Sequence, residues 1–269
     1  MNFLAFVDIQ KTMEGMVSFD FDKLFVPEIF SSCVIILLLI ILCIATYIVS
    51  KKAMKNPLKT PKGLMFLMCL AVEKCEDFVV SVMGEKNRGF SGYILALMTF
   101  TFFAFTWGLT GMASPMTYFG VPFSLALITF ILIHAQAVKT NKWRYFHRYV
   151  EPFPFFLPIN LVTMWAPLLS LSLRMFGNAM AGFCLMSVVY YGCEYLSTMI
   201  IQGAEVAGAL TSSNLGPAGM LFAPLLTPIL HAYFDLFSGA IQTIVFTLLT
   251  LIYVYQEQGD EPEATIDAV

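Results

Sequence analysis

A single arginine, Arg174, is the residue whose surroundings point most directly to a chemical role. It is the only charged residue between positions 165 and 191, and the only Lys or Arg between positions 152 and 256. A cation at the centre of a bilayer costs about 2.5–3.5 kcal/mol on insertion scales. We therefore interpret Arg174 as a fixed charge that meets a mobile negative charge. A snorkelling arginine is the alternative, but apolar sequence extends for more than two helical turns on either side.

Small and polar residues recur around Arg174 at helical spacing. Ser170, Arg174 and Asn178 fall on one face of an α-helix, and Gly177 and Gly182 lie close to that stripe. Small residues let a second helix come close, so that the long guanidinium can project across the gap. The pattern predicts a helix whose polar face meets another element inside the membrane.

A second polar stripe lies nearer the C-terminus. His231, Asp235, Ser238 and Gln242 are spaced 4, 3 and 4 residues apart, which places them on one helical face. A carboxylate and an imidazole one turn apart can pass on a proton, because each can bind and release one. The stripe predicts a proton relay. Two alternatives stay open: a polar patch that holds helices together, and an interfacial role for His231 alone.

Further polar residues are distributed unequally on the two sides of the arginine. Two acids, Glu194 and Glu205, follow it toward the next loop, and Glu194 is the more deeply embedded in apolar sequence. Glu205 has an equally good alternative role as a solvated residue at the loop edge. On the other side the helix offers only Ser170, Thr163 and Asn160. We therefore predict two dissimilar access routes separated by a positive charge.

A fixed cation between two access routes has a specific consequence for a moving partner. A carboxylate on that partner can approach the arginine only when it is deprotonated. It must be reprotonated before it faces lipid, because a bare carboxylate in hydrocarbon is costly. The arginine also repels protons that would leak straight through. The arrangement can therefore convert an ion gradient into motion of the partner.

The composition is that of a membrane protein. Of 269 residues, 58% are hydrophobic and only 12% are charged, whereas about 25% is usual for a soluble domain. Mean hydropathy is +0.78. The six cysteines form no CxxC pair and mostly lie in apolar stretches, so we expect reduced, structural thiols. The acidic residues in 1–30 and the lack of a basic start predict no cleavable signal and favour a bacterial plasma membrane.

We expect one all-α polytopic membrane domain over residues 1–269, with about five membrane-embedded helices and one interfacial amphipathic helix. The basic stretches at 51–88 and 139–148 predict a cytoplasmic location for both, hence an external N-terminus and a cytoplasmic C-terminus. The expected segments are an external N-terminal segment (1–30), a first transmembrane helix (31–49), an interfacial helix (63–83), a helical hairpin (92–137), two long tilted helices (155–255) and a cytoplasmic tail (256–269). A short soluble helix packed on the others is the alternative for 63–83.

The last two helices are too long to cross a membrane upright. The apolar stretch 161–201 would reach about 60 Å as one helix, twice the thickness of the hydrocarbon core. We therefore expect these helices to tilt steeply or to break. The candidate break points are Pro167, Gly192, Pro224 and Pro228.

Two segments resemble the signatures of a known family. Leu-Ser-Leu-Arg-Met-Phe-Gly-Asn at 171–178 is similar to a signature of subunit a of F-type ATP synthases. His-Ala-Tyr-Phe-Asp-Leu-Phe-Ser-Gly-Ala-Ile-Gln at 231–242 resembles the second signature of that family, and Pro-Ile-Asn-Leu at 158–161 also matches. The resemblance extends over about 31–255.

This resemblance implies the stator half of a proton-conducting membrane sector. The two long helices would lie against a ring of c subunits, each with a lipid-facing carboxylate, and form two offset half-channels. Arg174 corresponds to the essential arginine of the family, and Asn178 and Gln242 to its polar companions. Other implied partners are the b subunits of the peripheral stalk, the whole ATP synthase complex and membrane lipid. No cofactor, metal or nucleic acid is expected.

The chain departs from the family pattern at two positions. Many relatives carry an acid nine residues after the arginine, where this chain has Phe183, and another four residues after the Asn160 match, where it has Met164. We expect Asp235 to take over the outer relay, with Glu194 as a second candidate. The inner route lacks a familiar acid.

Two other function classes fit the composition less well. A self-contained secondary transporter or ion channel is the main alternative, but transporters usually contain internal repeats with matched broken helices. The sequence has no such pairing. A membrane enzyme is the third class, and the sequence lacks a metal cluster, a nucleophile–base pair or a phosphate loop.

Overall fold

The computed structural model describes residues 27–53, 63–142, 155, 157–206 and 223–258. Within these ranges the chain is helical and contains no strand. Five helical stretches are long and apolar enough to cross a membrane. The expectation of an all-α polytopic membrane protein is therefore confirmed. The expected external segment, the basic loop after 142, the loop after 206 and most of the C-terminal tail lie outside the described residues.

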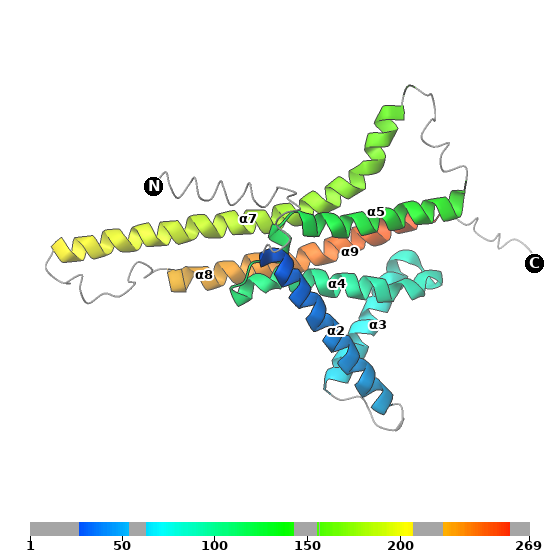
Figure 1. Cartoon of the computed structure of the whole chain (residues 1–269), viewed down its shortest axis with the longest axis horizontal. Coiled ribbons are helices and arrows are strands. Elements are labelled where there is room, and N and C mark those ends of the chain that lie inside the picture. The colour runs from blue at the N-terminus through cyan, green and yellow to red at the C-terminus, as the bar shows by residue number, and fades with distance from the viewer. Residues whose placement is uncertain (1–26, 54–62, 143–154, 156, 207–222, 259–269) are drawn as a thin grey trace, which may run out of the picture.

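The N-terminal half contains an oblique first helix, a charged helix and a helical hairpin. Its elements are α2 (Pro27–Ala53), α3 (Leu64–Met83), the short 3₁₀ segment η1 (Glu85–Phe90), α4 (Ser91–Thr106), the 3₁₀ turns η2 (Trp107–Thr110) and η3 (Pro115–Thr117), and α5 (Gly120–Asn141). Helix α2 runs obliquely away from the other helices (Figure 1). Most of its apolar side chains are exposed, as expected for a helix that faces lipid.

Helix α3 differs from its neighbours because it carries charges. Glu73, Lys74, Glu76 and Asp77 interrupt its apolar sequence, and it is not among the candidate membrane spans. Glu76 forms an ion pair with Arg88 of η1, with 3.0 Å between Oε2 and Nη2. This contact joins α3 to the start of α4.

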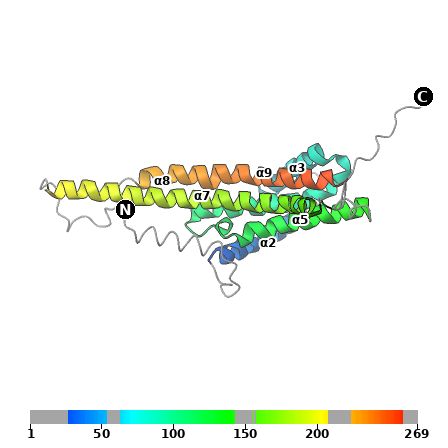
Figure 2. The ribbon, with the colours of Figure 1, turned by 90° about the horizontal axis from the view of Figure 1, so that it is seen from above.

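The C-terminal half consists of two long helical runs. The first is α7 (Leu157–Val206), a single helix of 50 residues. The second comprises α8 (Ala223–His231), a π-helical segment η7 (Ala232–Ser238) and α9 (Gly239–Gln256) in direct succession. The two runs lie side by side over much of their length (Figures 1 and 2).

Neither long run is broken at the positions the sequence suggested. Helix α7 passes through both Pro167 and Gly192 without interruption. It bends in its N-terminal third and then runs straight to its far end (Figure 1). Pro167 lies in that third, and a proline inside a helix removes one backbone hydrogen bond and bends the helix. Pro228 likewise lies inside α8.

The buried core lies where α4, α5, α7 and α9 meet. Its centre includes Phe105, Leu171, Met175 and Phe246, each at most 4% exposed. Close approach of α4 and α9 depends on Gly239, since a Cβ there would lie 2.7 Å from the Cβ of Phe105. This core fixes the second long run against both the hairpin and α7, and so positions its polar residues.

Candidate functional site

Arg174 lies on α7 within the candidate membrane span Val162–Ser197. Its side chain is exposed. Among the residues that the structure describes, no carboxylate comes within ion-pair distance of its guanidinium. Leu169 and Leu173 beside it are also about half exposed. The arginine is therefore presented outward from an apolar helix surface and not neutralised by the described part of its own chain.

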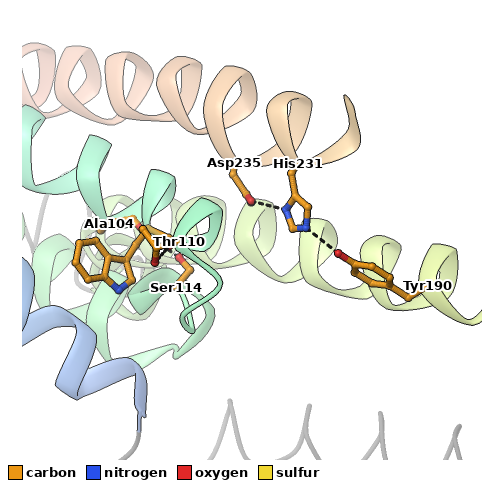
Figure 3. Close-up of polar contacts among 7 residues, drawn as sticks. Ala104, Thr110, Ser114, Tyr190, His231 and Asp235 are labelled. Atoms are coloured by element: carbon orange, nitrogen blue, oxygen red, sulfur yellow. Dashed lines mark hydrogen bonds and ion pairs between the residues drawn. The ribbon is translucent and has the colours of Figure 1, made fainter. Parts of the chain in front are cut away.

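Three side chains from the two long runs form a hydrogen-bonded chain. His231 Nδ1 lies 2.7 Å from Asp235 Oδ2, and His231 Nε2 lies 3.1 Å from the hydroxyl of Tyr190. Figure 3 shows Asp235 and His231 on the second long run and Tyr190 on α7, with the imidazole between the other two groups. The Asp235 and His231 side chains are 23% and 31% exposed, so the chain is partly accessible from outside the protein.

Asp235, which supplies the carboxylate of this hydrogen-bonded series, lies in a π-helical segment. Residues Ala232–Ser238 adopt the wider helix, and the expectation of an ordinary α-helical face across 231–242 is wrong for this stretch. A π segment adds one residue to a turn and shifts the faces of the residues that precede it against those that follow it. His231 and Asp235 therefore point toward Tyr190, while the α-helical register of α9 starts afresh at Gly239.

Two predicted site residues, one from each polar stripe, are joined directly. Ser238 Oγ donates a hydrogen bond of 2.6 Å to Asn178 Oδ1, across the interface between the π segment and α7. Gln242 is 9% exposed, and its Nε2 is buried without a hydrogen-bond partner among the described residues. Gly182 of α7 lies beside Phe234, and a Cβ at position 182 would lie 3.5 Å from the Cβ of the phenylalanine. A Cβ would therefore fit at position 182 at ordinary contact distance and would meet no atom within 4 Å at Gly177, so this packing does not require either glycine.

The structure does not join the remaining candidate residues to the hydrogen-bonded series of Tyr190, His231 and Asp235. Glu194 is exposed on α7 and has no ion pair or hydrogen bond to His231 or Asp235. Glu205 lies in the last turns of α7, with its side chain outside the described part of the structure. At the other end of α7, Thr163 Oγ1 donates to the carbonyl of Ile159, and Ser170 is exposed. Asn160 is half-buried on the same stretch.

Sequence reasoning missed two contributors to the site. Tyr190 is one of two successive tyrosines, and nothing in the local pattern distinguished the one that reaches His231. Gly108 of η2 lies against the carboxyl of Asp235, which would be 3.0 Å from a Cβ on this glycine. Both contacts join elements distant in sequence. A spacing argument within one helix therefore could not have found them.

The arrangement can hold and move protons. Among the described residues no three His, Cys, Asp or Glu side chains come together as metal ligands would. A phenol, an imidazole and a carboxyl group in series can each donate or accept a proton. What the site can do is therefore proton exchange beside an outward-facing cation.

Comparison with known proteins agrees with this reading. The family model described as ATP synthase A chain matches residues 31–255. The chain is 29% identical to ATP synthase subunit a of Mycoplasma pneumoniae over 84% of this chain and 77% of the relative. It is 25% identical to ATP synthase subunit a of Listeria monocytogenes over 92% of this chain and 96% of the relative.

A further relative carries the name of an ion. The chain is 30% identical, over 55% of its length and 42% of the relative, to a protein of Propionigenium modestum named ATP synthase subunit a, sodium ion specific. Because the family model covers most of the chain, including both polar helices, the chain belongs to the ATP synthase A chain family and is a multi-pass membrane subunit of an ATP synthase complex.

Proposed function

We propose that this chain is the ion-translocating stator subunit of an F-type ATP synthase. It forms two offset half-channels against a ring of c subunits, so that proton flow drives rotation and ATP synthesis, or the reverse. The observation that carries the proposal is the exposed guanidinium of Arg174, which lies within a candidate membrane span and has no acid partner in the described part of its own chain. A charge kept in that setting needs an anion from another molecule.

The exposed surface of the long helices supports contact with such a partner. Large apolar side chains of both runs are exposed, among them Leu173, Val188, Tyr233, Phe237 and Ile241. A ring of apolar helices would cover them and would bring its own carboxylates to Arg174. Each carboxylate would release its proton before it meets the guanidinium and bind another before it returns to lipid.

The half-channel on the outer side uses the chain of Tyr190, His231 and Asp235. These groups lie in series at hydrogen-bond distance, which supports stepwise proton transfer toward the arginine. Asn178, Ser238 and Gln242 line the approach between the helices, and Glu194 and Glu205 remain candidates for its outer mouth. The inner half-channel uses Asn160, Thr163 and Ser170 on the first third of α7.

The remaining partners and the placement in the cell follow from the same role. The chain would contact the b subunits of the peripheral stalk, and it would lie in a bacterial plasma membrane with its N-terminus outside and its C-terminus in the cytoplasm. The positive-inside rule supports this orientation, because twelve of the fifteen Lys and Arg residues fall in the two stretches predicted to be cytoplasmic.

Substitution of Arg174 by Ala tests the proposal in the assembled complex. We expect loss of ATP-driven proton pumping in membrane vesicles with normal amounts of assembled complex, because the ring carboxylate loses its counter-charge. Coupled pumping at the normal rate would overturn the proposal.

The same vesicles identify the ion. Pumping that persists without sodium supports protons as the coupled ion. Strict dependence on added sodium would instead identify sodium, the ion in the name of the Propionigenium modestum relative.

A further inference from the structure

The carboxyl group of Asp235 occupies a space that a glycine of another helix leaves open. A Cβ on Gly108 would lie 3.0 Å from Asp235 Oδ2, 3.2 Å from Cγ and 3.4 Å from Oδ1. The whole carboxyl group, and not only its tip, therefore rests on the bare backbone of Gly108. A side chain at position 108 would require the carboxyl group to shift by a few tenths of an ångström.

Backbone conformation does not account for this glycine. The described glycines with positive φ are Gly63, Gly84 and Gly111, and Gly108 is not one of them. An alanine could therefore adopt the backbone of Gly108 without strain. The close approach of the carboxyl group is what sets Gly108 apart from glycines such as Gly92, where a Cβ would meet no atom within 4 Å.

The histidine contacts the same carboxyl group. Oδ2, the atom nearest to the Gly108 position, is also the atom bonded to His231 Nδ1 at 2.7 Å. A displacement from position 108 therefore acts on the bonded oxygen itself. The ionisable groups at this carboxyl are His231 from its own run and, through the imidazole, Tyr190 from α7. The turn η2 has no ionisable side chain, and the tyrosines of α4 and α9, Tyr93, Tyr253 and Tyr255, lie toward the other ends of those helices.

We propose that Gly108 is a positioning residue of the outer proton relay. Because Gly108 lacks a side chain, η2 can lie directly against the Asp235 carboxyl group. This contact holds the carboxyl group within hydrogen-bond distance of His231, which in turn contacts Tyr190. The relay is thus built by three elements and not by the two long helices alone. This inference deepens the proposed function and rests on it.

The thermal stability of single and double variants tests the contact between Gly108 and Asp235 independently of proton transport. We expect Gly108→Ala to lower the thermal stability of the assembled complex when residue 235 is Asp, because the new Cβ meets the carboxyl group. The same substitution should cost nothing in an Asp235→Ala background, where all three of the nearest atoms are gone. Gly92→Ala is the matched control and should not distinguish the two backgrounds. An equal effect of Gly108→Ala in both backgrounds would overturn the proposal.

A transport measurement tests the role itself. We expect Gly108→Ala to slow ATP synthesis driven by an external acid pulse by about tenfold or more, because a displaced donor or acceptor transfers protons poorly. Its dependence on external pH should also shift, since the carboxyl group no longer faces His231. Gly92→Ala should retain the normal rate and profile. In an Asp235→Asn background, Gly108→Ala should add no further loss of rate.

The outcomes separate this inference from the proposed function. If Asp235→Asn slows proton uptake while Gly108→Ala behaves like Gly92→Ala, the positioning role is wrong and the stator function stands. If Asp235→Asn has no effect on uptake, Asp235 is not part of the relay and the positioning role is wrong as well. The stator function itself is decided by Arg174→Ala.

Discussion

At the scale of single residues, the site combines a cation that has no carboxylate partner among the described residues with a hydrogen-bonded series of proton-exchanging groups. Arg174 supplies the positive charge of its guanidinium. Asp235, His231 and Tyr190 supply groups that can change their protonation by passing on a proton. The two sets lie on the same pair of helices. Under the proposed function, a proton would reach the neighbourhood of the arginine without passing it.

Tyr190 is expected to orient His231, and Tyr190→Phe tests this. An interhelical hydrogen bond within a membrane is worth about 0.6 kcal/mol on average, which corresponds to about a threefold effect. We expect about this loss in the rate of proton uptake from outside, measured with a pH-sensitive dye in vesicles. The neighbouring Tyr191, which is 44% exposed, offers the control Tyr191→Phe. Equal rates in the two variants would remove Tyr190 from the relay.

Cysteine reactivity offers a second measurement at the residue scale. Burial raises the pKa of the Cys75 thiol, and the nearby Glu76 carboxylate raises that pKa further. Cys75 is 5% exposed and its thiol lies 3.4 Å from the carbonyl oxygen of Ser91, whereas Cys69 on the same helix is exposed.

We expect a maleimide to label Cys75 at least about tenfold more slowly than Cys69 near pH 8, as measured by mass spectrometry, because less of the Cys75 thiol is in the reactive thiolate form. The gap should narrow as the pH rises and the Cys75 thiol ionises. Equal labelling rates would contradict the packing of α3 on α4.

At the scale of elements, the second long run is held by close contacts on both sides. Gly239 lets α9 approach α4, and Phe234 of the π segment packs on α7 beside Gly182. Side-chain hydrogen bonds add to these contacts, with Ser238 bonded to Asn178 across the interface. The π-helical segment is thus clamped between α7 and the hairpin. Its register is set by these neighbours together with its own sequence.

Gly239→Ala tests the close approach of α9 to α4. A Cβ at this position would lie 2.7 Å from the Cβ of Phe105, too close for either helix to stay in place. We expect a loss of about 1–3 kcal/mol in the free energy of unfolding, measured by denaturant titration in detergent, as is usual for an overpacked core. The control Gly92→Ala meets no atom within 4 Å and should be neutral or slightly stabilising. An unchanged stability of Gly239→Ala would contradict the close approach.

At the scale of the whole molecule, the helices form an asymmetric assembly. The helices α4, α5, α7 and α9 share a core, to which α2 contributes Ile35 while it exposes much of its remaining apolar surface. The end of the second long run is tied back to the hairpin, because Asn87 of η1 and Gln258 exchange two hydrogen bonds of 2.8 and 3.0 Å. The core thus supports the long helices from one side, and α7 presents Arg174 outward.

The orientation of this assembly can be measured with single cysteines. Glu85 and Met112 lie before and after α4, so a helix that crosses the membrane places them on opposite sides. We expect an impermeant maleimide to label Met112→Cys in intact cells and Glu85→Cys only in inverted vesicles, each in a cysteine-free background. The positive-inside rule is the reason, since Glu85 lies in a basic stretch. The reverse pattern would place the relay on the cytoplasmic side.

The sequence by itself determined the fold class and the key cation. Long apolar segments must be helical in lipid, because no water is present to bind their backbone groups. A lone arginine in such a segment, like Arg174, can be recognised from the sequence, because the free-energy cost of placing its charge in the membrane does not depend on which helix lies beside it. The polar residues Asp235, His231, Asn178 and Ser238 were also found from their spacing.

Only the tertiary structure decided how those residues meet. Periodicity predicts which residues share a face of one helix, but not how that face meets a neighbouring helix. In the second long run the π segment changed even the predicted face. The contacts of Tyr190 with His231, of Ser238 with Asn178 and of Gly108 with Asp235 each join separate elements. Such contacts depend on the packing of large side chains and glycines throughout the core, and no local stretch of sequence contains that information.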